Sequence, residues 1–422
     1  MSTSSHEATC AKLDPGRFLP PFVLVLCTSM LLATSAHGQP SHNQRRTSNP
    51  STSDAYSARI RTLESTQGAY SYQLGEQLLG YGRALQVQGD HKQAVDVFKR
   101  AVHLARVNDG LYSQSQIPLV LAQISSLMSM RDYATADERQ TYLHRIQTRV
   151  LDAGTERAQA YMQQANWHRS AYELAIGNNE GERLLNMRYL YRLAVTDIVN
   201  AEGEKSRSLL TPLLGLLRTQ HLITRFEVGS YTGSGPFKSY SDDTEGMLIA
   251  AQSRTFKEGQ AVIRAIQNIK NDEDPSNKAR HVEALVQMGD WYLWNQKRRK
   301  AFEIYQTALA ELATLDDTEA LRRRLFDNPV ALPVLDDLKF LPVEVSAEEA
   351  DILLEFSVSA RGKVSDIVQI KTAKEPKTEM RRLMRQLRAV PFRPRFDGNT
   401  PVDTEKVSKA FTIAVDKEDK HG

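Results

Sequence analysis

Cysteine is almost missing from this chain of 422 residues, in which Cys10 and Cys27 are the only two. Both lie within residues 1–38, a segment with the layout of a cleavable secretory signal peptide. If this segment is removed, the mature chain has no cysteine, which excludes disulfides, thiol nucleophiles and cysteine metal sites. An exported chain without disulfides fits a bacterial periplasm better than a eukaryotic secretory route.

Long apolar runs are also missing. The most apolar stretch, Phe22–Ala33, follows Arg17 and is shorter than the ~20 residues needed to span a bilayer. Small residues at Ala36 and Gly38 complete a cleavage signal, so we expect processing between Gly38 and Gln39 and no membrane span afterwards. The alternative is that the same run is kept as an inner-membrane anchor.

Neither sign of charge is in excess, because 54 Lys and Arg oppose 51 Asp and Glu, for a net charge of +3. No strong attraction to nucleic acid follows from this balance. Catalytic signatures are missing too: there is no H-E-x-x-H and no G-x-S-x-G, and the glycine-rich stretch at 227–243 lacks a Gly-Lys-Ser/Thr ending. We therefore predict no catalytic residue, no cofactor, no metal and no enzyme activity. The alternative, an enzyme of envelope polymers, would place its site in the 227–243 loop beside Asp242, Asp243 and Glu245.

The chain does have helical periodicity, which runs almost without interruption from 59 to 325 and follows a polar, flexible leader at 39–58. Within it, segments 75–108 and 282–315 carry small and aromatic residues at the same offsets. These positions are Gly82, Ala94 and Phe98 in the first segment and Gly289, Ala301 and Tyr305 in the second. Small residues allow paired helices to approach closely, and the rings fill the space beside them.

This pattern resembles the tetratricopeptide repeat, a two-helix unit of about 34 residues. The resemblance implies an α-solenoid over 59–325, with a concave face that holds extended or helical peptides. Arg131–Ala136 has the composition of a further turn and helix start, and 155–176 and 178–201 have helix-length apolar periodicity. We expect these stretches to be degenerate repeats.

The C-terminal part of the chain has a pattern of strands and turns in place of the helical periodicity. A proline-containing connector at 326–350 leads to a strand at 352–358, a turn at Arg361–Lys363, a strand at 364–371 and a helix at 376–389. Phe392-Arg393-Pro394, then Gly398 with Pro401-Val402, and a closing strand at 411–415 follow. This order over 351–417 resembles the C-terminal domain of TonB-type energy transducers. The resemblance implies a small α+β domain that captures a short segment of an outer-membrane receptor.

Two basic clusters stand out. One is Lys297–Lys300, at the turn between two predicted helices. In the other, Arg381, Arg385 and Arg388 share one face of the helix predicted at 376–389. These three arginines are candidate contacts for an acidic partner or an anionic envelope polymer, and a solvated helix face explains them as well. Nucleic acid is not an expected ligand of an exported protein.

The sequence thus favours a mainly α protein, a tetratricopeptide-like solenoid followed by a TonB-like domain. Its predicted function is that of a periplasmic adaptor or scaffold that binds a protein or peptide of the cell envelope without catalysis. The alternative is an energy transducer anchored in the inner membrane, but the chain lacks a convincing anchor and a proline-rich spacer. We rank the adaptor first.

Overall fold

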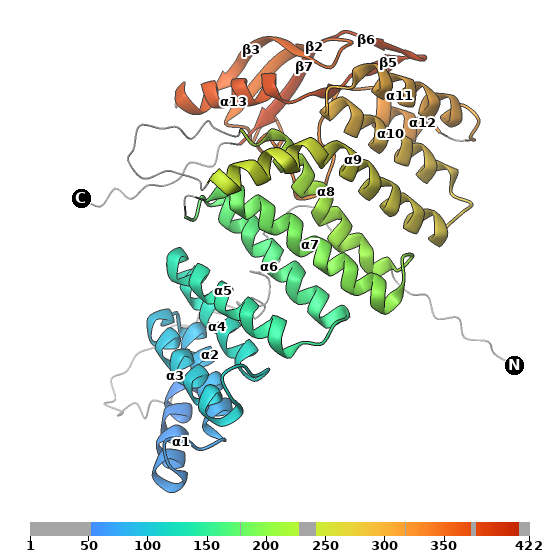
Figure 1. Ribbon diagram of the computed structural model, residues 1–422. Helices are drawn as coiled ribbons and strands as arrows, with labels where there is room; N and C mark the ends of the chain where they lie inside the picture. Colours follow the sequence, from blue (N-terminus) through green and yellow to red (C-terminus); the bar gives the residue numbers. More distant parts are fainter. Residues whose placement is uncertain (1–51, 178, 228–241, 317, 373–376, 413–422) are drawn as a thin grey trace, which may run out of the picture. The chain divides into compact units, whose positions relative to one another are not determined.

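The computed structural model describes residues 52–177, 179–227, 242–316, 318–372 and 377–412. The predicted cleavage site at Gly38 and Gln39 and most of the 227–243 loop lie outside these ranges. The described chain is mainly helical, with a small strand-containing region toward its C-terminal end (Figure 1).

Helices from α1 to α11 each contact the next one along the chain. They are α1 (Thr52–Gln67), α2 (Leu74–Gln88), α3 (His91–Asp109), α4 (Gln116–Ser129), α5 (Tyr133–Val150), α6 (Thr155–Glu173), α7 (Glu180–Glu202), α8 (Leu210–Arg225), α9 (Asp242–Glu273), α10 (Lys278–Trp294), α11 (Arg298–Leu312) and α12 (Glu319–Phe326), with a 3-10 turn at Arg207–Leu209. The first helix begins at Thr52, inside the stretch predicted to be a leader. Only Ser53 and Ile60 of this helix are buried, and its other residues are largely polar, which is why the sequence predicted a leader here.

The same tight turn joins α2 to α3, α4 to α5 and α10 to α11. Gly89, Arg131 and Gln296 adopt left-handed backbone conformations at φ 82°, 59° and 61°. In each case the next N–H bonds to a carbonyl five residues back, as Asp90 does to Leu85 at 3.0 Å. In the first two turns the following aspartate, Asp90 or Asp132, also caps the new helix. The turn predicted at 131–136 is therefore present.

Beside two small clusters of four and three residues, two large hydrophobic cores occupy the helical region. One is built from α1 to α5, and the other runs from α6 to α12 and includes residues of the C-terminal region. The boundary between α5 and α6 is partly polar: the Asp137 carboxylate accepts from Trp167 at 2.7 Å and from Arg183 at 2.6 and 2.9 Å. Burial, with Arg183 nearby, lowers the pKa of His168 at this boundary to about 4.

The C-terminal region holds a three-stranded antiparallel sheet in the order β3-β2-β7, with α13 (Lys377–Ala389) packed on it. The strands are β2 (Ile352–Val358), β3 (Val364–Thr372) and β7 (Thr404–Phe411). The strand predicted at 352–358 is present with these bounds, and every second side chain of it is buried. These side chains share one core with Leu383, Leu387, Phe392 and Phe411.

The last strand differs from the prediction. It ends at Phe411, where the sequence predicted a strand to begin, and residues beyond 412 lie outside the description. The segment 404–410 is rich in charge and does not read as a strand. It becomes one because it pairs with β2 along most of its length, from Thr404 opposite Val358 to Phe411 opposite Ile352.

Short strands that the sequence did not predict connect this sheet to the helices. β1 (Val330–Ala331) pairs with β4 (Phe392–Arg393), and β5 (Arg395–Asp397) pairs with β6 (Thr400–Val402). Gly362, at φ 72°, lies in the β2–β3 turn, and a Cβ there would lie 2.0 Å from the Phe392 carbonyl oxygen. The turn therefore accepts only glycine, and the Phe392 N–H bonds to the Gly362 carbonyl at 3.0 Å.

Candidate interaction surface between the last helices and the C-terminal strands

The glycine and aromatic residues singled out in the sequence meet in space. A Cβ on Gly82 would lie 2.3 Å from the Phe98 ring, and one on Gly289 would lie 2.4 Å from the Tyr305 ring. Ala94 and Ala301 are completely buried beside them. Each pair of helices thus approaches closely where one helix has a glycine and the other an aromatic ring.

A buried ion pair links α10 to β4, two segments that are far apart in the sequence. Arg393 Nη1 donates to Asp290 Oδ1 at 2.9 Å and to Oδ2 at 2.8 Å, and Tyr305 Oη donates to Oδ1 at 2.7 Å. Burial raises the pKa of Asp290, and the Arg393 guanidinium opposes that shift. A neutral Asp290 would leave the Arg393 charge without compensation in a buried place, so the geometry favours the ionised pair.

Beside this ion pair, an aromatic cluster joins the same two regions. The ring centroid of Phe396, in β5, lies 5.4 Å from that of Phe326 and 5.7 Å from that of Tyr305. Phe396 is buried within the second helical core. The segment after the predicted Phe-x-Pro motif therefore packs into the helical region.

A third contact lies at the ends of three helices. Arg225, the last residue of α8, donates from Nη1 to the carbonyl of Ala389, the last residue of α13, at 2.8 Å. Its guanidinium carbon is 5.2 Å from the Trp294 ring and 5.5 Å from the Phe340 ring. Phe340 packs against both the second helical core and the core of the sheet. Burial lowers the pKa of Arg225.

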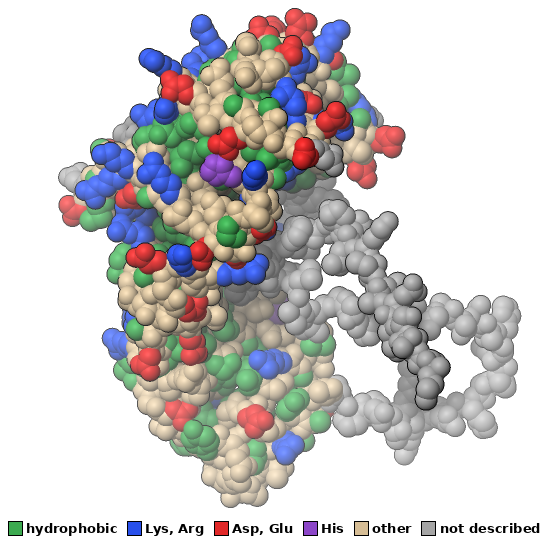
Figure 2. Space-filling view, turned by 90° about the vertical axis from the view of Figure 1, so that its right-hand side faces the viewer, with side chains coloured by type: hydrophobic (Ala, Val, Ile, Leu, Met, Phe, Trp, Pro, Cys, Tyr) green, Lys and Arg blue, Asp and Glu red, His purple; other side chains and the backbone are tan. Residues whose placement is uncertain are grey.

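Arg381, Arg385 and Arg388 lie exposed on α13, where they line a shallow hollow together with Met384. Arg393, which follows them by a few residues in the sequence, instead points inward to Asp290. In the face that Figure 2 presents, Lys and Arg side chains are more numerous in the upper part than in the lower part.

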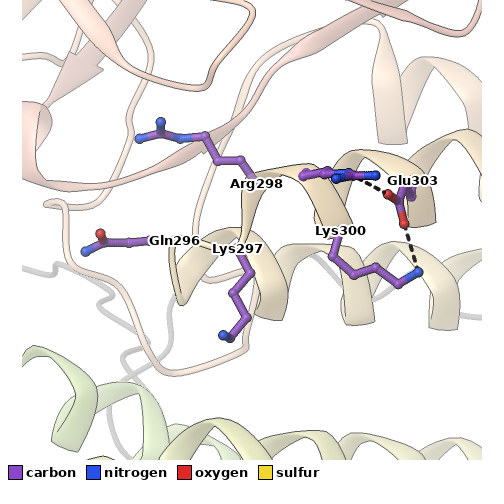
Figure 3. A pocket seen from close by; sticks show the side chains of 6 residues that line it. Gln296, Lys297, Arg298, Lys300 and Glu303 are labelled. Carbon is purple, nitrogen blue, oxygen red and sulfur yellow. Dashed lines mark hydrogen bonds and ion pairs between the residues drawn. The ribbon is translucent and has the colours of Figure 1, made fainter.

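The second basic cluster lines another open hollow, at the start of α11 (Figure 3). Lys300 pairs with Glu303 at 2.8 Å, and Arg299 pairs with the same carboxylate at 3.3 Å. Lys297 and Arg298 extend in different directions, and the Lys297 ammonium lies 4.6 Å from the Phe256 ring centroid. Four cations and one carboxylate leave this hollow with a positive balance.

The outer strand β3 forms one edge of the described sheet. Among the described strands it pairs with β2 alone. Val368 and Ile370 are 53% and 55% exposed on it. The opposite edge of the sheet, on β7, is partly covered, because the N–H group of Val345 bonds to the Ala410 carbonyl at 3.0 Å and Glu344 forms an isolated bridge with Phe411.

In the ranges given above, no group of three or more His, Asp or Glu side chains is placed to hold a metal ion. No described helix is both long and apolar enough to cross a membrane. The carboxylates named for an enzyme site, Asp242, Asp243 and Glu245, all lie in the first turn of α9, and residues 228–241 are outside the described ranges.

The sequence missed the Asp290–Arg393 pair because its partners are 103 residues apart. One signal was present: Gly289 is followed by an aspartate where Gly82 is followed by Arg83, inside an otherwise matching pattern. Comparison of the sequence with models of known protein families finds no matching family, and a search of curated proteins finds no match either.

Proposed function

We propose that this chain is a periplasmic protein-interaction adaptor, built from tetratricopeptide-like helix pairs and a TonB-like C-terminal domain. The repeated turns and the glycine-aromatic contacts of α2–α3 and α10–α11 support the first part. The strand, strand, helix, strand order of β2, β3, α13 and β7 supports the second.

The observation that carries the proposal is the position of β3 at the edge of the described sheet. The N–H and C=O groups on such an edge form hydrogen bonds with an incoming extended segment, which adds a strand to the sheet. The exposed Val368 and Ile370 side chains supply apolar contacts beside it. Binding through backbone groups needs no catalytic residue.

Single prolines in β3 test this mode of binding. In an edge strand, successive N–H groups point alternately toward the neighbouring strand and outward. One of the two variants Ile367→Pro and Val368→Pro therefore removes an outward N–H group. That variant blocks the outer edge and should disturb the fold less than the other. We expect that variant of the full-length protein to stay folded by circular dichroism and to lose capture of its partner from periplasmic extract. Val368→Thr, which keeps the backbone groups, should retain capture.

Loss of capture only in unfolded variants would exclude strand addition. If the wild-type protein itself captures nothing from the extract, the adaptor function is wrong. N-terminal sequencing of the protein from its native envelope tests the location, and a mature chain that begins at Gln39 is the expected result.

A further inference from the structure

We propose that the two basic clusters act as one surface, and that this surface binds an acidic, extended segment of a partner protein. This inference rests on the proposed adaptor function and names the chemistry of its partner. The clusters are Arg381, Arg385 and Arg388 on α13, and Lys297–Lys300 at the start of α11.

Arg225 connects the two clusters. It touches the carbonyl of Ala389, the residue after Arg388, and it lies over the ring of Trp294, which ends α10 shortly before Lys297. The C-terminal ends of α8, α10 and α13 therefore meet at this arginine. Ala389 follows Arg388, and Trp294 lies three residues before Lys297, so Arg225 links the segments that carry the two runs of positive charge.

The charges of this surface are poorly neutralised. Among the described residues, no carboxylate forms an ion pair with any of the three α13 arginines. In the other cluster Glu303 is shared by two cations, and Glu227 is the further carboxylate near Arg225. A surface of one sign attracts a partner of the opposite sign and speeds its encounter.

A protein segment fits this surface better than a membrane does. The hollow on α13 contains one apolar side chain, Met384, whereas helices that bind membranes present several Trp, Phe or Leu residues for insertion. Moreover, α13 contacts β3, which is an outer strand of the described sheet. A polypeptide satisfies both features, because its backbone pairs with β3 and its carboxylates reach the arginines.

The experiment uses the full-length protein and a fluorescent peptide in which glutamate alternates with valine, so that it can form a strand. Binding is followed by fluorescence anisotropy at low salt and at about 0.3 M salt, where charge interactions are screened over a few ångströms. One triple variant carries R381E, R385E and R388E, and another carries R298E, R299E and K300E. The matched control carries R59E, R61E and K92E, three exposed cations of α1 and α3.

We expect each cluster variant to bind the peptide about tenfold more weakly or worse at low salt, and to lose much of the salt dependence, while the control stays within about twofold of wild type. Triple glutamine variants repeat the test if charge reversal impairs folding. An equal loss in the control, or a loss in only one cluster variant, would overturn the single surface. Tighter binding to phosphatidylglycerol vesicles or to an anionic polysaccharide than to the peptide would overturn the choice of partner.

Capture from periplasmic extract separates this inference from the function on which it rests. If the cluster variants lose the peptide but retain the same captured partner as wild type, the acidic-segment inference fails and the adaptor function stands. If no version of the protein captures a partner, the adaptor function itself fails.

Discussion

The helix pairs α2–α3 and α10–α11 carry the same pattern and have different neighbours. In both, a glycine faces an aromatic ring, an alanine is completely buried, and a left-handed residue makes the turn. In the first pair, the core cluster of Leu85, Ala94 and Phe98 is covered by Ala122 of the next helix, α4. In the last pair, Tyr305 is covered instead by Phe396 of a C-terminal strand.

The difference is encoded in two positions. Phe98 becomes Tyr305, whose hydroxyl donates to Asp290, and the exposed Arg83 becomes the buried Asp290. These changes convert a surface that receives another helix into one that receives Arg393. A shared repeat pattern thus fixes how two helices pair, and a few polar substitutions decide what packs against the pair.

The largest effect on stability should come from removing the guanidinium of Arg393, which neutralises the buried Asp290 carboxylate. Arg393→Met leaves a buried carboxylate without its partner, so the free energy of unfolding should fall by about 3–5 kcal/mol. Arg83→Met, at the exposed equivalent of Asp290, should change it by less than ~0.5 kcal/mol. Urea denaturation followed by circular dichroism measures both. Asp290→Asn combined with Arg393→Met should recover much of the loss, and equal stability of the two single variants would contradict the burial of the pair.

The pH dependence should distinguish the last pair as well. His221 of α8 is buried against Trp291 and Trp294, whose positions in α2 are Ala84 and Val87. Burial lowers its pKa from 6.5 to about 3, so between these pH values the unfolded chain binds the extra proton. Stability should therefore fall as the pH drops below 6.5, by about 1.4 kcal/mol per pH unit for this residue.

Substitution of this histidine tests the effect directly. His221→Leu removes the titrating group, so the decline in unfolding free energy between pH 6.5 and 4.5 should become shallower than in the wild-type protein. Denaturant titrations at several pH values give the two slopes, and parallel slopes would show that His221 is accessible to protons in the folded state.

Overpacking should affect both pairs alike. Ala94→Leu and Ala301→Leu each force a larger side chain into a completely buried contact, at an expected cost of about 1–3 kcal/mol. Lys300→Ala, one position before Ala301 and exposed, should cost less than ~0.5 kcal/mol. If Ala301→Leu and Lys300→Ala melt at the same temperature, the predicted packing register is wrong.

The smallest effect concerns a single hydroxyl. Tyr305→Phe removes one hydrogen bond to Asp290 while the ion pair remains, so we expect a loss of about 1 kcal/mol. The reciprocal change, Phe98→Tyr, places a hydroxyl in an apolar contact and should also destabilise the protein. A Tyr305→Phe protein as stable as wild type would show that Arg393 alone satisfies the carboxylate.

The parts of the fold that were predictable depend on local patterns. Helical periodicity located α6 and α7, and a run of β-branched and aromatic residues located β2 within its observed bounds. The bounds of β7 were not predictable, because pairing with β2 outweighs the weak strand propensity of its charged segment. The ion pair of Arg393 was not predictable either, since nothing in the sequence around Arg393 reveals a partner as distant as Asp290.

The distance between Asp290 and Arg393 along the chain has a consequence for the order of events during synthesis. A ribosome releases α10 and α11 well before residue 393, so these helices can pair before the Arg393 guanidinium is available to neutralise Asp290. Until the last strands emerge, the Asp290 carboxylate and the Tyr305 ring face water or a chaperone. Completion of the C-terminal strands therefore acts as the closing step for the last helix pair, and a chain truncated before Phe392 would leave that pair open to proteases.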